Sequence, residues 1–233
     1  MVLEQLSDGA SRHLSAFDAD TRRLVFILCL PLIDGVFATL LVTGAVQTFS
    51  DILAVALTIF TGAGALAVLY SSADSFGEAA GMVTKAAPVL LLGAAVVAMT
   101  APIYEQLFYV ERLRYAAGIA LLVIAADMLD LEVVEYFPVP AVLVTGMAVS
   151  LRNPGALEFT LAYLQPALLT ALASIAGLYV AATLASRDLD LGYVRRGGSA
   201  VLFIIGLSQF GLQLPSGLGL AVFAASVAAS LRL

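Results

Sequence analysis

Long apolar runs separated by short polar stretches are the main pattern of this chain. The first run extends from Arg22 to Gln47. With about 23 apolar residues at a rise of ~1.5 Å each, it is long enough to cross the ~30 Å hydrocarbon core of a bilayer. Further runs follow at 52–71, 86–104, 115–131, 138–151, 159–185, 198–212 and 218–231. The pattern predicts an all-α integral membrane protein, a bundle of about seven or eight transmembrane helices, some of them short or broken.

One acid lies near the middle of the first run. A charge at that depth costs about 3 kcal/mol on insertion scales, so Asp34 is expected to face a cavity or a partner. A structural hydrogen bond to a neighbouring helix returns only ~1 kcal/mol, which favours a functional role. Pro31 removes a backbone donor and Gly35 lowers helix propensity. A helix break beside a midplane carboxylate is typical of ion or substrate sites in transporters.

A second acid and several neutral side chains complete the candidate site. Asp127 lies in the last turn of the fourth run, where snorkelling to the membrane surface is an equally good interpretation. Pro166 is expected to kink the sixth helix. The candidate neutral ligands are Thr43, Thr145, Ser208 and Gln209.

Composition supports the membrane assignment, and the balance of acidic and basic residues is unusual. Hydrophobic residues make up 61% of the chain and the mean hydropathy is +1.02, above the range of soluble domains. There are 17 acids against 11 bases, and Lys85 is the single lysine. Acidic, lysine-poor surfaces stay soluble in concentrated salt, and in this composition the chain resembles uncharacterised polytopic membrane-protein families of haloarchaea. That resemblance implies a halophilic, archaeal membrane protein and assigns no site residue.

Several function classes are excluded by what the sequence lacks. The one histidine, His13, precedes the apolar runs, which excludes a bis-histidine haem protein. The one cysteine, Cys29, excludes internal disulfides and thiolate metal clusters. Lys85 at the edge of a run argues against a retinal Schiff base, and no Gly-rich phosphate loop follows a strand pattern. We therefore expect no cofactor, no structural metal, no nucleic-acid partner and no enzymatic activity.

The charged connections suggest a topology. Arg22 and Arg23 open the first run, just before its apolar residues, which places the polar segment 1–21 in the cytoplasm under the positive-inside rule. The stretch from Ser72 to Lys85 is expected to be a loop or a short interfacial helix. With eight crossings, the basic loop containing Arg187 is also cytoplasmic, whereas three other arginines fall outside: Arg112, Arg114 and Arg152.

Two weak internal matches suggest different duplications. The string from Leu41 to Gly44 recurs from Leu143 to Gly146, which divides the transmembrane domain 22–233 into parallel halves, 22–137 and 138–233. A competing match pairs Tyr109-Val110-Glu111-Arg112 with Tyr193-Val194-Arg195-Arg196 and implies another offset. Duplicated halves are common in secondary transporters, and both alternatives stay open.

The sequence favours a secondary transporter in the cell membrane. It would move a cation or small solute coupled to protons or sodium, because a carboxylate binds either a proton or a cation. Asp34 would be the coupling residue. Two alternatives remain: a channel in which a homo-oligomer supplies a ring of Asp34 carboxylates, and a non-transporting scaffold or accessory subunit. The expected partners are the lipid bilayer and a small ion or solute.

Overall fold

The computed structural model describes residues 18–131, 136–152, 160–184, 190–212, 214–215 and 217–230. His13, Arg187 and most of the polar segment 1–21 lie outside these residues. The all-α prediction is confirmed, because the described residues form helices and no β-strand. The helices are α2 (Ala19–Ile33), α3 (Val36–Val42), α4 (Phe49–Val55), the π-helix η1 (Ala56–Phe60), α5 (Ala63–Ser72), α6 (Phe76–Leu107), α7 (Val110–Asp127), α9 (Val139–Ser150), α10 (Leu164–Leu184), α11 (Leu191–Ser208) and α12 (Leu218–Ser230).

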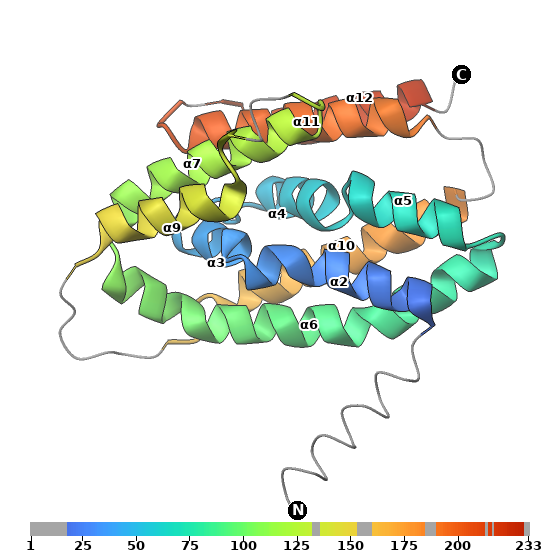
Figure 1. Cartoon of the computed structure of the whole chain (residues 1–233), viewed down its shortest axis with the longest axis horizontal. Helices are drawn as coiled ribbons and strands as arrows, with labels where there is room; N and C mark the ends of the chain where they lie inside the picture. Colours follow the sequence, from blue (N-terminus) through green and yellow to red (C-terminus); the bar gives the residue numbers. More distant parts are fainter. Residues whose placement is uncertain are drawn as a thin grey trace, which may run out of the picture.

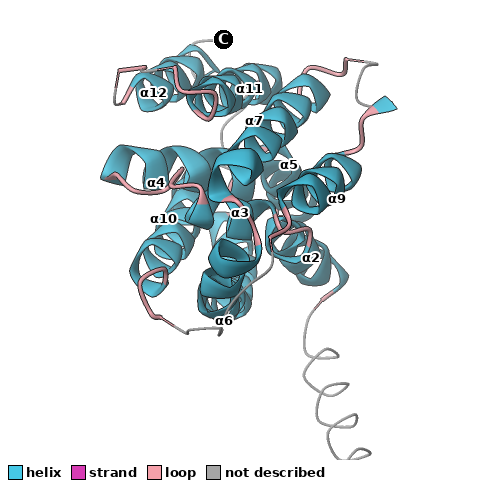
Figure 2. Ribbon diagram, turned by 90° about the vertical axis from the view of Figure 1, so that its left-hand side faces the viewer, coloured by secondary structure: helices cyan, strands magenta, loops and turns pink. Residues whose placement is uncertain are grey.

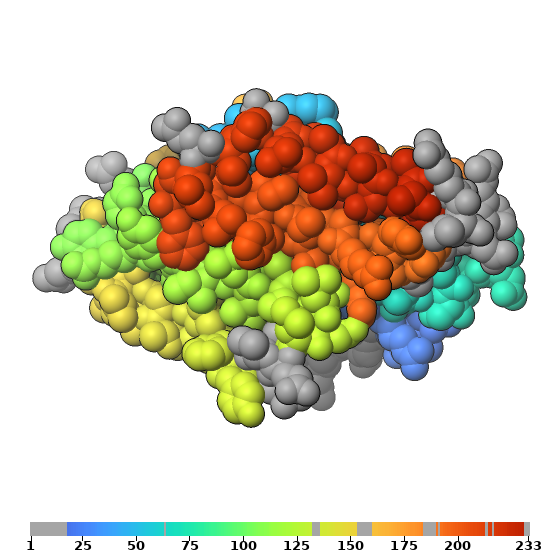
Figure 3. Space-filling view, turned by 90° about the horizontal axis from the view of Figure 1, so that it is seen from above, coloured from blue at the N-terminus to red at the C-terminus, as the bar shows by residue number. Residues whose placement is uncertain are grey.

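The helices form three layers, with two broken helices in the middle (Figures 1 and 2). One broken helix is α2 with α3, and the other is α4 and η1 with α5. On one side of them lie α6 and α10, which pack along each other. On the other side lie α7, α11 and α12, with α9 beside α7. Figure 3 looks onto this outer layer and shows α12, α11, α7 and α9 side by side.

Successive long helices run in opposite directions, so the start of one helix lies beside the end of the next at each end of the bundle. At one end, Lys85 Nζ donates to Asp18 Oδ2 at 3.0 Å, which joins the start of α6 to the start of α2. The Ser199 hydroxyl donates to the Ala125 carbonyl near the end of α7. At the opposite end, the Tyr163 hydroxyl donates to Glu105 Oε2 at 2.8 Å, between α10 and α6. Up-and-down packing of this kind is what short connections between long helices produce.

Two sequence predictions need correction. The stretch from Ser72 to Lys85 is mostly not a loop, because α6 begins at Phe76 and continues for 32 residues. Ser75 caps it: its hydroxyl accepts the backbone N–H of Glu78 at 3.3 Å, which is enough to start a helix within a polar segment. Pro166 does not kink α10. It lies in the first turn, where the N–H that proline lacks has no helical partner in any case.

Part of the predicted membrane bundle is supported by length and hydropathy. Among the described helices, α6 and α10 are long and apolar enough to cross a membrane, and each bent pair passes as one span, which gives up to four. The helices α9 and α12 are apolar but short. Large apolar side chains are exposed on the outward faces, among them Leu92, Val144, Leu172, Val180 and Phe203. Seven or eight crossings stay a prediction.

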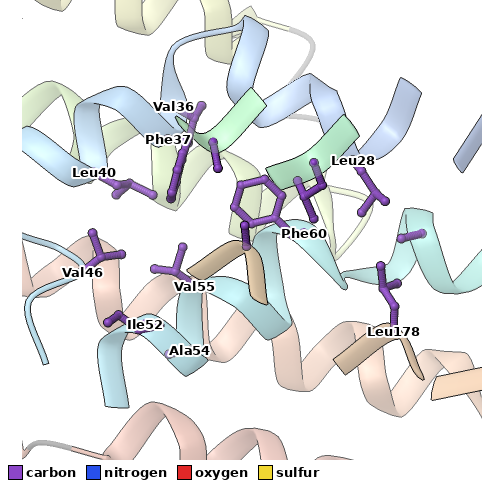
Figure 4. Close-up of a cluster of buried hydrophobic side chains, with 14 of the residues drawn as sticks. Leu28, Val36, Phe37, Leu40, Val46, Ile52, Ala54, Val55, Phe60 and Leu178 are labelled. Carbon is purple, nitrogen blue, oxygen red and sulfur yellow. The ribbon is translucent and has the colours of Figure 1, made fainter. Parts of the chain in front are cut away.

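The core lies where the two broken helices meet α10 (Figure 4). Phe37 follows the break between α2 and α3, and Phe60 ends η1 at the other break. Their rings are fully buried and meet edge to face, with centroids 5.2 Å apart at 84°. Such a pair contributes about 0.5–1.5 kcal/mol beyond the apolar area that it buries. The two breaks are therefore fixed against each other by an aromatic contact.

Candidate functional site

The first break places Asp34 between two helix ends. The α2 helix ends at Ile33 and α3 begins at Val36, with a bend of 45° between them. Asp34 Oδ1 accepts the backbone N–H of Val36 at 3.0 Å, so the carboxylate satisfies the first N–H of α3. Pro31 lacks an N–H, which leaves the carbonyl of Ile27 without its usual helical donor.

Gly35 is required by the geometry of this break. Its φ is +83°, in the left-handed region that side chains with a Cβ rarely adopt. The Gly35 carbonyl accepts two hydrogen bonds from Thr39, one from the backbone N–H at 3.0 Å and one from the hydroxyl at 2.9 Å. This carbonyl is thus engaged inside α3, and the free acceptors at the break are on Asp34 and the end of α2.

The second break lies between η1 and α5, where the helix formed by α4 and η1 makes a bend of 56° with α5. At η1 the backbone hydrogen bonds change from the α-helical to the wider π-helical spacing of five residues. The carbonyl of Ala56 accepts from both the backbone N–H and the hydroxyl of Thr61. Gly62 follows, and a Cβ there would lie 2.2 Å from the carbonyl oxygen of Thr58. Only glycine fits under that carbonyl. π-Helical segments of one turn are frequent at functional sites.

A cavity of about 520 Å³ connects the two breaks with the end of α7. Its polar lining includes Asp34, Thr58, Asp127, Asp130 and Arg195, and its other walls are largely apolar. Asp34 is half-buried, whereas Asp127 and Asp130 are exposed. The cavity therefore extends from a carboxylate in the middle of the α2–α3 span to two carboxylates at the end of α7.

The cavity lining has a net negative charge, with three carboxylates and one guanidinium. Arg195 Nη1 donates to Asp130 Oδ1 at 3.0 Å, and Nη2 donates to Asp130 Oδ2. Both side chains are well exposed, at 40% and 70%, so this pair contributes at most about 1 kcal/mol. Asp34 and Asp127 have no cationic partner among the described residues. The ends of α2 and α7 add partial negative charge, and the starts of α3 and α9 add the opposite sign.

The carboxylates are not arranged as a compact metal centre. Within the described parts of the chain, no three His, Cys, Asp or Glu side chains lie close enough together to hold a metal ion. The cavity is also larger than a dehydrated ion needs. Its chemistry suits a proton, a cation that keeps part of its water shell, or a small organic cation whose apolar part contacts the walls.

The structure brings four of the predicted ligands together as two separate pairs. Asp34 and Asp127 line the same cavity. Ser208 and Gln209 line a separate pocket at the opposite end of the bundle. Thr43 donates its hydroxyl to the Thr39 carbonyl at 2.8 Å within α3. Thr145 lines an apolar groove between α7 and α9.

Other residues of the cavity were not selected from the sequence. Thr58 and Gly62 could have been considered, because threonine and glycine recur through the second run. Close helix packing was, however, the stronger interpretation of those glycines. Asp130 and Arg195 had no signal as a pair. They are far apart in the chain and meet only because α7 and α11 pack along each other.

Comparison with known proteins identifies a family and no activity. The model of a family described as a family of unknown function (DUF5794) matches residues 90–210. Because this match covers more than half of the chain, the chain belongs to that family. No curated protein and no solved structure matches the chain. The matched range contains Asp127 and Arg195, whereas Asp34 precedes it.

Proposed function

We propose that this DUF5794 member is an integral membrane secondary transporter. It moves a cation or a small cationic solute in exchange for, or together with, protons or sodium. The observation that carries the proposal is the shared cavity: Asp34 and Asp127 line one space at two helix breaks. Broken helices around a carboxylate near the middle of the bilayer are the usual construction of such sites.

The proposal includes eight crossings of the cell membrane. The helices α7, α9, α11 and α12 would cross beside the four longer spans because they pack in the same up-and-down bundle. The end of the bundle where α2 starts would be cytoplasmic. In the described parts of the chain it has five bases against three at the other end, namely Arg22, Arg23, Lys85, Arg195 and Arg196 against Arg112, Arg114 and Arg152. The end of the cavity at Asp127 and Asp130 would then open to the cytoplasm.

The chemistry would depend on competition at Asp34. One carboxylate oxygen is held by the N–H of Val36, so the group has a fixed orientation toward the cavity. A proton and a cation cannot both occupy the charged carboxylate, since protonation removes the charge that the cation needs. Asp127, which is exposed at the end of α7, would attract the cation before it reaches Asp34. The two acids thus have different roles, coupling and recruitment.

The position of Asp34 also weighs against the scaffold alternative. Its hydrogen-bond partner is the backbone of its own break and not a neighbouring helix. A structural aspartate would be expected to tie two helices together, because that contact is what offsets part of its insertion cost. A channel remains distinguishable by its kinetics, since a conductance does not saturate as an exchanger does.

The experiment is proton flux in proteoliposomes. An internal pH dye is read while sodium, potassium or calcium is added outside, with wild type beside Asp34→Asn. Asparagine keeps an oxygen for the N–H of Val36 but cannot exchange a proton. Asp74→Asn is the matched control, because Asp74 is an exposed acid that does not line the cavity. We expect a cation-specific pH change that is lost in Asp34→Asn and kept in Asp74→Asn.

The other results are equally informative. An Asp34→Asn protein that exchanges cations for protons as the wild type does would remove Asp34 from the mechanism. A flux that rises linearly with cation concentration would favour the channel. Asp127→Asn should weaken the apparent affinity for the cation and leave the maximal rate nearly unchanged. An equal loss in both variants would make Asp127 a second coupling residue.

A further inference from the structure

A second polar pocket lies at the opposite end of the bundle from the Asp34 cavity. It has a volume of about 140 Å³ and lies among the start of α4, which includes Asp51, the start of α7, the end of α11 and the start of α12. Gln209 is only 4% exposed, and its Oε1 has no hydrogen-bond partner among the described residues. Arg114, also in the lining, has a buried Nε without a partner. An unpaired acceptor and an unpaired donor in a space with room for a few waters indicate a hydrated site.

The starts of α7 and α11 share a local structure that the sequence match between them anticipates. Arg112 lies over the ring of Tyr109, with its guanidinium carbon 5.1 Å from the centroid. Arg196 lies over Tyr193 in the same way, at 5.9 Å. In both helices the tyrosine precedes the arginine by three residues. The Tyr-Val-x-Arg match is therefore a structural repeat as well as a string of letters.

The offset that carries Tyr109 onto Tyr193 also carries whole helices onto one another. It lays α6 on α10, α7 on α11 and, to within about a turn, α9 on α12. Each matched pair is antiparallel, and α7 packs against α9 as α11 packs against α12. Where α7 and α11 cross, Gly118 and Gly206 face each other's carbonyls, at 3.0 and 3.2 Å from the positions where a Cβ would be. The pattern is that of an inverted repeat, with the helix triplets α6–α7–α9 and α10–α11–α12 as its units.

The same offset relates the two pockets. Ile124 in the lining of the Asp34 cavity maps onto Ser208 in the Gln209 pocket, and Asp130 maps onto Leu214. Each pocket also has one arginine that is the fifth residue of the partner helix, Arg195 in α11 and Arg114 in α7, although the offset itself carries Arg195 onto Glu111. The volumes differ several-fold. The two pockets thus lie at corresponding ends of α7 and α11 and differ in volume.

We infer that the Gln209 pocket is the second mouth of the solute pathway, related to the Asp34 cavity by this inverted repeat, and that it binds the same small hydrated cation when it opens. The pathway itself rests on the proposed function. In the present conformation the pocket beside Arg195 has the larger volume and the pocket beside Gln209 the smaller, and we call them the wide and the narrow mouth. The Asp130–Arg195 pair, which joins the end of α7 to the start of α11, holds that conformation. The parallel halves that meet at Pro138 stay a separate prediction.

The test is thiol accessibility, which needs no transport. Cys29 is the only cysteine of the chain, so Cys29→Ala gives a cysteine-free background. The repeat-related positions take the reporters, Ile124→Cys for the wide mouth and Ser208→Cys for the narrow one. A membrane-impermeant maleimide is applied to one face at a time, with intact cells and inside-out vesicles. We expect the two reporters to react from opposite faces.

The decisive variant is Arg195→Gln, which removes the ion pair. Loss of one exposed pair should shift the population between conformations by about two- to five-fold. Labelling of Ser208→Cys should therefore become faster by that factor, and labelling of Ile124→Cys slower. Arg196→Gln is the matched control, because Arg196 stacks on Tyr193 and forms no ion pair within the described residues. It should leave both rates unchanged.

Other outcomes would overturn the inference. Both reporters reacting from the same face, or both rates moving in the same direction in Arg195→Gln, would exclude two alternating mouths. No labelling of Ser208→Cys from either face would also exclude the second mouth, provided that Phe210→Cys, at an exposed neighbouring position, is labelled from the face expected for Ser208→Cys. The two hypotheses can also fail separately. If the two labelling rates shift in opposite directions in Arg195→Gln while Asp34→Asn still couples cations to protons, the two mouths stand and only the proposed function is rejected.

Discussion

Gly35→Ala tests whether the break at Asp34 is a strained feature that only glycine supports. At φ +83° an L-residue other than glycine loses about 1–2 kcal/mol. Alanine also lowers the conformational entropy of the unfolded chain, which stabilises the folded state by ~0.4–1 kcal/mol. The added methyl itself has room, since its nearest neighbour would be Met147 Cε at 3.4 Å. The net expectation is a destabilisation of about 1 kcal/mol, which corresponds to roughly 2–4 °C in the unfolding midpoint of a chain of this size.

The assay is thermal unfolding in detergent, followed by the helical circular-dichroism signal. Gly81→Ala is the matched control, because Gly81 lies inside α6 with nothing within 4 Å of the new Cβ. Alanine there should raise the midpoint by roughly 1–4 °C, since it favours the helix by ~0.5–1 kcal/mol. Gly35→Asn should lose less than Gly35→Ala, because asparagine tolerates the left-handed region. If both alanine variants were stabilised alike, the left-handed break would be refuted.

Three further changes probe the core and one helix pair. Gly62→Ala should destabilise more than Gly35→Ala, by about 2 kcal/mol, because its Cβ would lie 2.2 Å from the Thr58 carbonyl oxygen; the same thermal assay measures it. Phe37→Ala should cost about 3–5 kcal/mol and lower the yield of folded protein on size-exclusion chromatography. Burial, then the hydrogen bond to Glu105 and its charge, raise the pKa of Tyr163 to about 12. That bond should persist below pH 10 and be lost as the pH rises through 12, so the tyrosinate absorbance of wild type minus Tyr163→Phe should titrate near 12 and not near 10.

The sequence located the first break but not the second, for a physical reason. A proline, an acid and a glycine within five residues each oppose a continuous buried helix, so Pro31, Asp34 and Gly35 mark the position together. The second break arises from one widened turn, η1, followed by Gly62. A glycine in an apolar run more often serves close helix packing, and a π-turn leaves no mark on hydropathy.

Contacts between distant helices were the other limit of the sequence. Asp127 could be chosen as an unusual acid, but its place in the same cavity as Asp34 depends on α7 packing against the broken helices. The same holds for Ser208 and Gln209, which were grouped with Asp34 and lie instead in a pocket of their own. The resemblance to haloarchaeal families rests on charge composition, which governs solubility rather than fold, and it stays a prediction.

The position of the broken helices joins the fold to the proposed mechanism. A break exposes backbone polar groups, and in hydrocarbon each unsatisfied group costs several kcal/mol, so a broken helix cannot face lipid. Both breaks of this chain lie in the middle layer, between α6 with α10 and the layer of α7, α11 and α12 (Figure 2). There Asp34 and residues of both breaks line a cavity inside the bundle. The aromatic contact of Phe37 with Phe60 fixes the breaks to each other, so a shift of the outer layers would change access to Asp34 without dismantling it.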